Sequence, residues 1–364
     1  MKIGIVGLPN VGKSTLFNAL TKTYAADAAN FPFCTIEPNV GIVDVVDERV
    51  DKLSEISKTQ KKVYANIKFV DIAGLVKGAS KGEWLGNKFL SNIRETDAIV
   101  QVLRHFDDSD VMHVEWSVDP LRDVEIINTE LIMSDIEQIE PKLPSMEKKA
   151  KSKDPEASKL YPVLKTIYDA LMQWKLAYEV KDEFSGEALD LLRSYNLLTF
   201  KPFVYAVNVS QDELASASAI KKEFEEKLKR PVAIVCAKIE SEMLGFSPEE
   251  RREFIEDMHP WKDVPTLDDM IALAFDTLGL MYYFTTGEKE TRAWTIEKWS
   301  RAPQAAWVIH TDFEKKFIKA EVVSYDKFID AGWRSQAREK WYLRLEWKEY
   351  IVHEWDVIVF KVGQ

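Results

Sequence analysis

Short apolar runs separated by segments with helical spacing predict an α/β fold for most of the chain. Each run has the length of one strand and is mostly apolar, which is typical of strands buried on both faces of a parallel sheet. The first helical segment, 13–23, follows soon after the first run. The predicted strands are Lys2–Val6, Val40–Val46, Ile67–Ile72, Ala98–Leu103, Phe203–Asn208 and Pro231–Val235.

A helical insertion interrupts the predicted sheet between its fourth and fifth strands. Residues 123–199 are rich in Glu, Lys and Leu with helical spacing, which predicts a helical hairpin. Its expected tip is the charged run 147–155. One interpretation of this run is a solvated loop, and the other is a contact with RNA phosphate or with a protein partner.

The pattern changes again near residue 281, where short runs with strand character surround one helical segment at 325–331. These runs predict a small, mostly β module at the C-terminal end. The strand-like runs of this module are 320–323, 342–345, 349–352 and 357–362. The predicted division of the chain is an α/β domain over 1–122 and 200–280, a helical insertion over 123–199, and the module over 281–364.

Composition and charge narrow the class of protein. The 364 residues are 46% hydrophobic and 30% charged, as in soluble globular proteins. Lys and Arg number 49 and Asp and Glu number 60, so the net charge is −11, and we expect no DNA partner. Cys34 and Cys236 are too few for a disulfide framework or a zinc cluster, and no apolar run has membrane-spanning length. We therefore expect a cytoplasmic protein with no membrane partner.

Residues 7–14, GLPNVGKS, match the phosphate-loop motif G-x-x-x-x-G-K-[ST] and lie between a predicted strand and a predicted helix. In this context backbone N–H groups surround the phosphates, Lys13 neutralises the β- and γ-oxygens, and Ser14 ligates Mg2+. The nucleotide-binding residues expected here are Asn10, Val11, Gly12, Lys13, Ser14 and Thr15.

Two further segments are expected to sense the γ-phosphate. The run 71–74, DIAG, ends a predicted strand, where Asp71 can reach the metal through water and the Gly74 N–H can meet the γ-phosphate. The loop 30–39 contains two prolines, and its Thr35 is the best candidate for a second Mg2+ ligand. The alternative for Thr35 is an ordinary loop hydroxyl. The expected metal ligands are Ser14, Thr35 and Asp71.

The base-reading motif N-K-x-D has a counterpart at 208–211, which reads NVSQ and lacks the guanine-binding carboxylate. Adenine presents a donor beside an acceptor, which the Gln211 amide can match, so ATP is favoured over GTP. The alternative is that Gln211 points to solvent and backbone atoms read the base. The expected contacts to the nucleoside come from the ends of two strands and are Asn208, Val209, Gln211, Cys236, Ala237 and Lys238.

The motifs do not identify the group that positions the hydrolytic water. Leu75 stands where Ras-like enzymes have a water-orienting Gln, and Leu cannot orient water. His113, in the loop 107–114, is a candidate for this role, with a solvated side chain as the alternative. Asn10 can help to hold a monovalent cation such as K+ near the phosphates, and Lys13 completes the expected catalytic group.

Several segments carry the motifs of one known family. They are Gly7–Ser14, Asn30–Asn39, Phe69–Gly82, Asn87–Leu90 and Ala302–Glu314. Together they resemble the YchF family, the ATP-preferring branch of the Obg-related P-loop NTPases, over essentially the whole chain. The resemblance implies a G domain, an inserted coiled-coil arm and a C-terminal TGS domain, which match the three predicted segments. It also implies slow ATP hydrolysis, binding to the ribosome or its subunits, including the large subunit, and a role in translation or stress response. In this family a histidine in a flexible loop is proposed to replace the missing Gln, and it matches His113.

The chain departs from the family pattern in two ways. The family usually has Glu where Gln211 stands, and it generally has Gly where seven tryptophans stand. Glycine is scarce, with 14 residues, and tryptophan is abundant, with 11. We hypothesise that the source organism has reassigned the codon UGA to glycine, and that these positions were translated as tryptophan under another genetic code. The alternative is a lineage that uses aromatic residues at these positions. The seven are Trp84, Trp116, Trp299, Trp307, Trp341, Trp347 and Trp355.

The sequence thus predicts a nucleotide-dependent switch that binds and slowly hydrolyses ATP with Mg2+ and associates with the ribosome. One alternative is an Obg-like GTPase. The other is a nucleotide-dependent ribosome- or RNA-binding adaptor with no relevant turnover.

Overall fold

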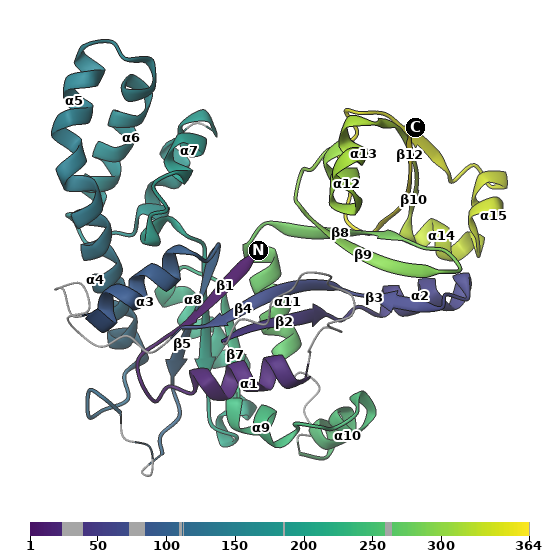
Figure 1. The fold of residues 1–364 in the computed structure, drawn as a ribbon. Coiled ribbons are helices and arrows are strands. Elements are labelled where there is room, and N and C mark those ends of the chain that lie inside the picture. Colours follow the sequence, from purple (N-terminus) through teal and green to yellow (C-terminus); the bar gives the residue numbers. More distant parts are fainter. Residues whose placement is uncertain are drawn as a thin grey trace. The chain divides into compact units, whose positions relative to one another are not determined.

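The computed structural model describes residues 1–23, 39–72, 84–108, 111, 113–184, 186–258 and 264–363. The chain divides into two compact units (Figure 1). The described residues of the first unit are those within 1–23, 39–41 and 68–274, and those of the second unit lie within 42–67 and 275–363. The helical insertion therefore lies in the first unit, whereas residues 42–67 lie with the C-terminal module.

A six-stranded sheet with the order β2-β4-β1-β5-β6-β7 forms the centre of the α/β fold. The pairs β1–β4, β1–β5, β5–β6 and β6–β7 are parallel, with Ile3 opposite both Phe69 and Ala98, and with Ala206 opposite Ala233. β5 and β6 are buried along their whole length, as their continuous apolar runs predict. The strands are β1 Lys2–Val6, β2 Val40–Val45, β4 Ala65–Asp71, β5 Ala98–Arg104, β6 Phe203–Asn208 and β7 Val232–Val235.

Helices cover this sheet through buried apolar side chains. Tyr205 of β6, Phe224 of α8 and Ile239 of α9 belong to one buried cluster. Burial raises the pKa of the Tyr205 phenol, as expected for a hydroxyl in an apolar layer. The helices of the α/β part are α1 Lys13–Thr23, α3 Trp84–Arg94, α8 Ala217–Leu228, α9 Ala237–Glu242, α10 Pro248–Met258 and α11 Leu267–Thr277.

The helical insertion is built on α4, which begins after the N-cap residue Asp119. α5 and α6 form a hairpin with α7 beside α6 (Figure 1). Ile139, Leu164 and Ile167 are fully buried and give the insertion a core of its own. The elements are α4 Pro120–Ile139, η3 Glu140–Lys142, α5 Leu143–Lys151, α6 Pro155–Leu171, η4 Ala177–Glu183, α7 Gly186–Arg193 and η5 Leu198–Phe200.

The second unit contains a six-stranded sheet with the order β11-β10-β12-β8-β9-β3. The strand-like run 349–352 is not a strand, because only Ile351 pairs there, in an isolated bridge to Arg301. β8 and β9 form an antiparallel pair, and β10 pairs antiparallel with β12. The elements are β8 Leu280–Thr285, β9 Glu290–Glu297, α12 Ala302–Ile309, α13 Thr311–Lys315, β10 Phe317–Ser324, α14 Tyr325–Ala331, α15 Arg334–Glu339, β11 Arg344–Glu346 and β12 Asp356–Val362.

Residues 42–67 supply an edge strand and a helix to this second unit. β3, Lys61–Val63, pairs in parallel with β9, which the sequence pattern does not predict. The helix α2, Glu48–Ser57, buries Val50 and Leu53, and the Ser57 hydroxyl lies 2.6 Å from the Thr286 hydroxyl. The second unit is therefore assembled from two distant stretches of sequence.

Five tryptophans have backbone angles that favour glycine. Their φ values lie between 60° and 71°, in the left-handed region. The other non-glycine residues with positive φ, among those described, are all Asn or Lys. The five are Trp116, Trp174, Trp299, Trp341 and Trp355.

Two of these tryptophans end helices at the position that glycine usually takes. After α15, the Trp341 N–H donates to Arg338 O and the next N–H, of Tyr342, donates to Ala337 O. This pair of bonds is a Schellman motif with Trp341 at its left-handed residue. Trp174 has the same place after α6, where its N–H donates to Leu171 O.

Four of the seven suspect tryptophans are thus in the left-handed region, and Trp174 joins them. Trp307 and Trp347 have no positive φ; their side chains are 50% and 62% exposed. Trp84 begins α3, and its side chain lies outside the described residues. The glycine hypothesis therefore gains direct backbone support at some positions and none at others.

Candidate functional site

The phosphate-loop motif forms the turn between β1 and α1. Gly7 lies so close to its surroundings that an added Cβ would meet Val102 O at 2.7 Å. At Gly12 φ is 94°, and an added Cβ would lie 2.3 Å from the Asn208 Nδ2. Gly7 is therefore required by the close approach of a backbone oxygen, and Gly12 by its positive φ and the close Asn208 side chain, as the motif predicts for a loop that surrounds phosphates.

Lys13 lies in this loop with its ammonium group held inside. Its side chain is buried, and its Nζ donates to Leu8 O at 2.7 Å. Burial lowers the pKa of Lys13 to about 8, while the nearby Asp71 carboxylate raises it. A buried cation whose hydrogen bond within the described structure goes to one neutral carbonyl is ready to bind an anion.

Asp71 and Ser14 come together because β4 and β1 are parallel neighbours whose carboxyl ends lie at one edge. The Ser14 hydroxyl donates to Asp71 Oδ2 at 3.1 Å. The other carboxylate oxygen, Oδ1, is buried and has no hydrogen-bond partner among the described residues. Burial raises the pKa of Asp71, and the Ser14 hydroxyl and Lys13 oppose that shift.

These oxygens fit a magnesium ion. Mg2+ prefers oxygen ligands, and it usually binds through one or two protein groups together with substrate phosphates and water. An unpartnered buried carboxylate oxygen beside a serine hydroxyl is a donor set of this kind. In the described part of the chain, no group of three or more His, Cys, Asp or Glu side chains offers a different metal centre.

Asn208, at the end of β6, connects the two loops expected to contact the nucleotide. Its Nδ2 donates to Val11 O at 3.0 Å, and its Oδ1 accepts from the Ala237 N–H at 3.0 Å. Asn208 is buried, so both contacts are shielded from water. The structure thus brings the phosphate loop and the segment 236–238 to one place.

The expected base-contacting residues differ in their exposure. The Gln211 side chain is exposed and makes no hydrogen bond to the described residues, so its amide is available to a ligand. The Val209 N–H donates to Val235 O at 2.9 Å. Cys236 is buried, which raises the pKa of its thiol, whereas Lys238 is exposed.

Glu213 holds the base-reading loop and was not singled out by the motifs. Its carboxylate accepts from the Ser210 N–H at 2.8 Å and from the Ser210 hydroxyl at 3.0 Å. It also lies 2.7 Å from His105 Nδ1. The sequence signal is an acidic residue three positions after Ser210, which is the spacing of a capped turn.

His113 is buried against α4 and is not solvated. Its Nε2 lies 2.8 Å from Asp123 Oδ2, and its Nδ1 accepts from the Glu115 N–H at 3.1 Å. Because a backbone N–H can only donate, Nδ1 is the acceptor, so Nε2 carries the hydrogen that faces Asp123. The interpretation of His113 as a solvated side chain is therefore wrong, while its catalytic role stays a prediction.

Arg94 connects the end of α3 with the base of the insertion. Its guanidinium donates to Gln138 Oε1, to Asn196 O at 3.1 Å and to Ser134 Oγ at 2.9 Å. It also lies 3.7 Å from Asp135, which is fully buried. Burial raises the pKa of the Asp135 carboxyl, and several hydrogen bonds oppose that shift. No motif marks this network, because its members are far apart in sequence.

Three expected residues lie outside the described residues. They are Thr35, Gly74 and Leu75. Their roles as metal ligand, γ-phosphate contact and replacement of the water-orienting Gln stay predictions. Of the remaining expected residues, Asn10 is exposed in the loop before α1 and has a φ of 63°, and Thr15 is exposed in the first turn of α1.

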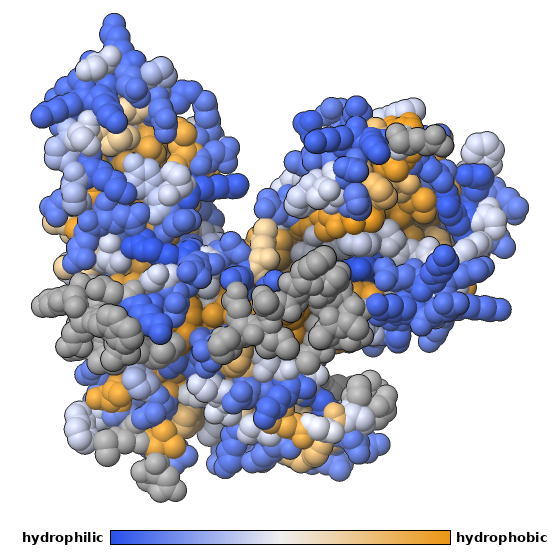
Figure 2. All heavy atoms as spheres, in the orientation of Figure 1, coloured by the Kyte–Doolittle hydropathy of each residue, from blue (hydrophilic) through white to orange (hydrophobic). Residues whose placement is uncertain are grey.

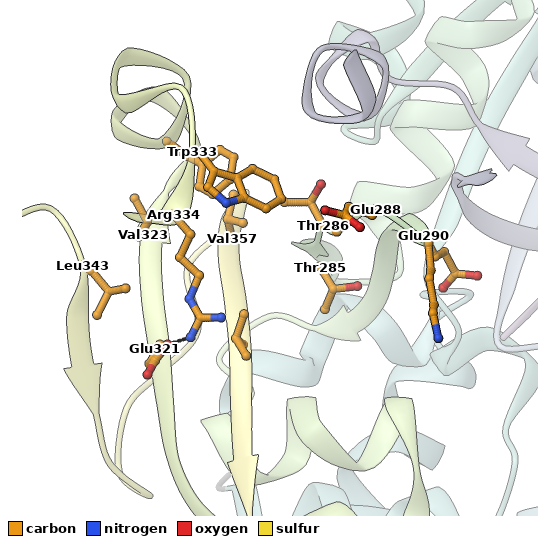
Figure 3. Close-up of a pocket in the computed structure, with 14 residues that line it drawn as sticks. Thr285, Thr286, Glu288, Glu290, Glu321, Val323, Trp333, Arg334, Leu343 and Val357 are labelled. Carbon is orange, nitrogen blue, oxygen red and sulfur yellow. Dashed lines mark ion pairs between the residues drawn. The ribbon is translucent and has the colours of Figure 1, made fainter. Parts of the chain in front are cut away.

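The second unit contains a separate cavity of about 520 Å³. Figure 3 shows its wall, where Arg334 forms an ion pair with the buried Glu321 beside Val323 and Val357. None of the residues expected to bind nucleotide lines this cavity. No helix in the described part of the chain is both long and apolar enough to cross a membrane.

Comparisons with known proteins agree with this architecture. Residues 2–138 match the MMR_HSR1 family, described as "50S ribosome-binding GTPase". Residues 280–363 match the YchF-GTPase_C family, described as "Protein of unknown function (DUF933)".

Full-length relatives are similar over nearly the whole chain. The sequence is 47% identical over 363 residues to the Ribosome-binding ATPase YchF of Bacillus subtilis (strain 168), covering 98% of each chain. It is 45% identical over 361 residues to the Ribosome-binding ATPase YchF of Escherichia coli O157:H7, covering 99% of this chain and 98% of the relative.

A solved structure extends the similarity to the fold. The YchF GTPase of Schizosaccharomyces pombe superposes with a TM-score of 0.85 at 38% identity, covering 99% of this chain and 97% of the other. The expected fold is confirmed: an α/β P-loop domain with a mostly parallel sheet, a helical insertion and a C-terminal α+β domain. The chain belongs to the YchF family of P-loop NTPases.

Proposed function

We propose that this protein is a ribosome-binding ATPase that uses Mg2+ and changes conformation with its nucleotide. The observation that carries the proposal is the phosphate loop, where buried Lys13 and the Ser14–Asp71 pair converge at the end of β1. The names of the relatives from Bacillus subtilis and Escherichia coli support ATP as the nucleotide and the ribosome as the partner.

Phosphate binding follows from the residues of the loop. The Lys13 ammonium leaves Leu8 O for the β- and γ-phosphate oxygens, because a charged acceptor replaces a neutral one. Backbone N–H groups at the start of α1 add the positive end of a helix. Ser14 and Asp71 would hold Mg2+, which supplies charge neutralisation at the phosphates when it is bound.

Slow turnover is expected from the residues around the γ-phosphate. Leu75 cannot position water, and Arg104, which is buried at the end of β5, is bonded to the carbonyls of Phe106 and Asp108. His113 would have to leave Asp123 before it could orient the water. Such a conformational step lowers the fraction of competent molecules and thus the rate. Asn10 could contribute by holding K+ near the phosphates.

The choice of nucleotide depends on Gln211. Its amide can donate to and accept from the adjacent adenine groups, whereas guanine offers two adjacent donors. Because the Gln211 side chain is exposed without a partner in the described structure, it can reach a base bound above Asn208. A GTPase is the second candidate, since the family description of residues 2–138 and the Schizosaccharomyces pombe structure both carry that word.

Equilibrium competition between Mg·ATP and Mg·GTP on the purified protein tests this proposal. We expect ATP to bind more tightly and Gln211→Ala to reduce the preference, while the neighbouring exposed variant Asp212→Ala leaves it unchanged. Tighter binding of GTP would reject the ATPase assignment in favour of an Obg-like GTPase.

Turnover measured on the same samples separates a switch from an adaptor. We expect slow single-turnover hydrolysis that ribosomes accelerate. Hydrolysis that is absent with and without ribosomes would leave the nucleotide as a structural ligand of an adaptor. Co-sedimentation with intact ribosomes and with isolated large subunits tests the partner directly.

A further inference from the structure

We propose that the tip of the helical insertion binds the phosphate backbone of ribosomal RNA through Lys148, Lys149 and Lys153. This tip joins the end of α5 to the start of α6. The proposal rests on the proposed ribosome binding and names the surface and the chemistry of that contact.

The tip is basic in an acidic protein. Residues 142–158 contain five Lys, two Glu and one Asp, so their net charge is 5 − 3 = +2. The whole chain has a net charge of −11, so the remaining residues carry −13. An acidic protein is repelled by RNA in general, and it can approach RNA only through a surface of opposite local charge.

The three proposed lysines are exposed and are not neutralised within the described structure. Lys151 lies 2.7 Å from Glu147 and forms an ion pair. Lys148, Lys149 and Lys153 form no ion pair with any described residue. Figure 2 shows the end of this hairpin covered by hydrophilic residues. The three ammonium groups are therefore available to an outside anion.

The turn that carries these lysines has a fixed shape. The Lys153 N–H donates to Ala150 O and the Asp154 N–H donates to Lys149 O, which ends α5 in a Schellman motif. Asp154 Oδ1 then accepts from the Ala157 N–H at 2.8 Å and caps α6. A rigid turn loses little conformational entropy when it binds, so a small number of charges can give a useful affinity.

The composition of the tip favours a phosphate backbone over other partners. Residues 142–158 contain no aromatic side chain on which bases could stack. None of the exposed large apolar side chains of the described structure lies at this tip, so neither a membrane nor an apolar protein groove fits it. Point charges without apolar or stacking groups are suited to sequence-independent contact with phosphates.

The lysines of the last turn of α5 also have a purely structural use, because cations stabilise the C-terminal end of a helix. That interaction does not depend on a partner and is made in the free protein. Helix stabilisation alone does not require the lysines to affect the affinity for RNA or ribosomes. A phosphate contact does, so a binding experiment separates the two roles.

The test compares the full-length variant K148E/K149E/K153E with the control K221E/K222E/K229E. The control changes the net charge by the same amount and uses exposed lysines on α8 and at its end. Each variant also includes one residue in the left-handed region, since φ is 52° at Lys229 and 62° at Lys153. Binding to intact ribosomes and to protein-free ribosomal RNA is measured over a series of KCl concentrations.

We expect the control to bind like the parent protein and the tip variant to lose about 10- to 100-fold in affinity for both targets. The slope of log K against log salt should become shallower by about 2 to 3, as for the loss of three phosphate contacts. ATP affinity and circular dichroism should be the same in all three proteins.

Equal losses in both variants, or no loss in the tip variant, would overturn the proposal. Loss of ribosome binding without any binding of the parent to protein-free RNA would assign the tip to an acidic ribosomal protein instead. If the parent protein binds protein-free RNA but not ribosomes, and the tip variant loses the RNA binding, the ribosome is rejected as the partner and the tip stays the RNA contact.

Discussion

Replacing Trp341 by glycine should stabilise this protein. The residue has a φ of 60° at the left-handed position of the Schellman motif that ends α15, and its side chain is 92% exposed. A left-handed conformation costs an L-residue about 1–2 kcal/mol, and glycine loses about 0.5–1 kcal/mol more backbone entropy on folding. Because almost no apolar surface is buried there, we expect a net gain of about 0.5–1 kcal/mol.

The expected gain differs among the five left-handed tryptophans. Trp355 lies over Arg49, with the guanidinium carbon 3.7 Å from the ring centroid, and it is only 36% exposed. Loss of that cation–π contact costs about 0.5–1 kcal/mol, so Trp355→Gly should be nearly neutral. Trp116 and Trp299 are 83% and 80% exposed and should behave like Trp341.

The assay is chemical unfolding followed by far-UV circular dichroism, since removal of tryptophan alters fluorescence directly. The midpoint should rise for Trp341→Gly with an unchanged m value. Trp341→Ala is the matched control. It removes the indole ring but keeps a Cβ, so the strain of the left-handed backbone remains and the midpoint should not rise. Equal midpoints for the two variants, or a lower midpoint for Trp341→Gly, would refute the reasoning.

The same residues allow a direct test of the glycine hypothesis. If the source organism reads these codons as glycine, the intact mass of the protein isolated from it will be lower than the mass of the printed sequence by one Trp-to-Gly difference at each such position. A mass equal to that of the printed sequence would end the hypothesis.

Three further predictions concern the nucleotide site and its connection to the insertion. Because burial lowers the pKa of Lys13 to about 8, ATP binding at pH 8.5 should take up protons as the phosphates raise that pKa; calorimetry in buffers of different ionisation enthalpy measures the uptake, and its absence would contradict the burial argument. Arg94→Ala should reduce the stimulation of hydrolysis by ribosomes while basal hydrolysis and ATP affinity stay close to those of the parent protein; unchanged stimulation would show that the network does not couple α3 to the insertion. His113→Ala should slow turnover with nearly unchanged ATP affinity, and Asp123→Asn, which weakens the hold on the His113 ring, should alter turnover without the full loss; equal rates in all three proteins would remove His113 from the mechanism.

The α/β part and the phosphate site could be predicted from the sequence because their signals are local. The apolar runs give the six strands of the first sheet, and the residues Lys13 and Ser14 follow β1 directly. Asp71 could be placed beside them because the carboxyl ends of neighbouring parallel strands lie at one edge. In each case a short stretch of sequence together with one rule of topology is enough.

Other features depend on contacts that spacing cannot reveal. The burial of His113 depends on Asp123, which belongs to a helix that begins after the loop. Run 349–352 has strand-like residues but pairs only through Ile351, so strand-like composition alone does not make this segment a strand. The pairing of β3 with β9 joins residues more than two hundred positions apart, and no local pattern indicates it.

The assembly of the second unit from two distant stretches of sequence limits how it can be exchanged by recombination. Residues 42–67 leave the first unit after β2 begins and return to it within β4, and between these points they supply α2 and β3 to the C-terminal module. A chain cut near residue 280 would leave Val50, Leu53 and the Ser57 hydroxyl without the partners that cover them. A single genetic crossover could therefore not exchange this module between homologues that have diverged at these contacts, so the two stretches are expected to evolve together.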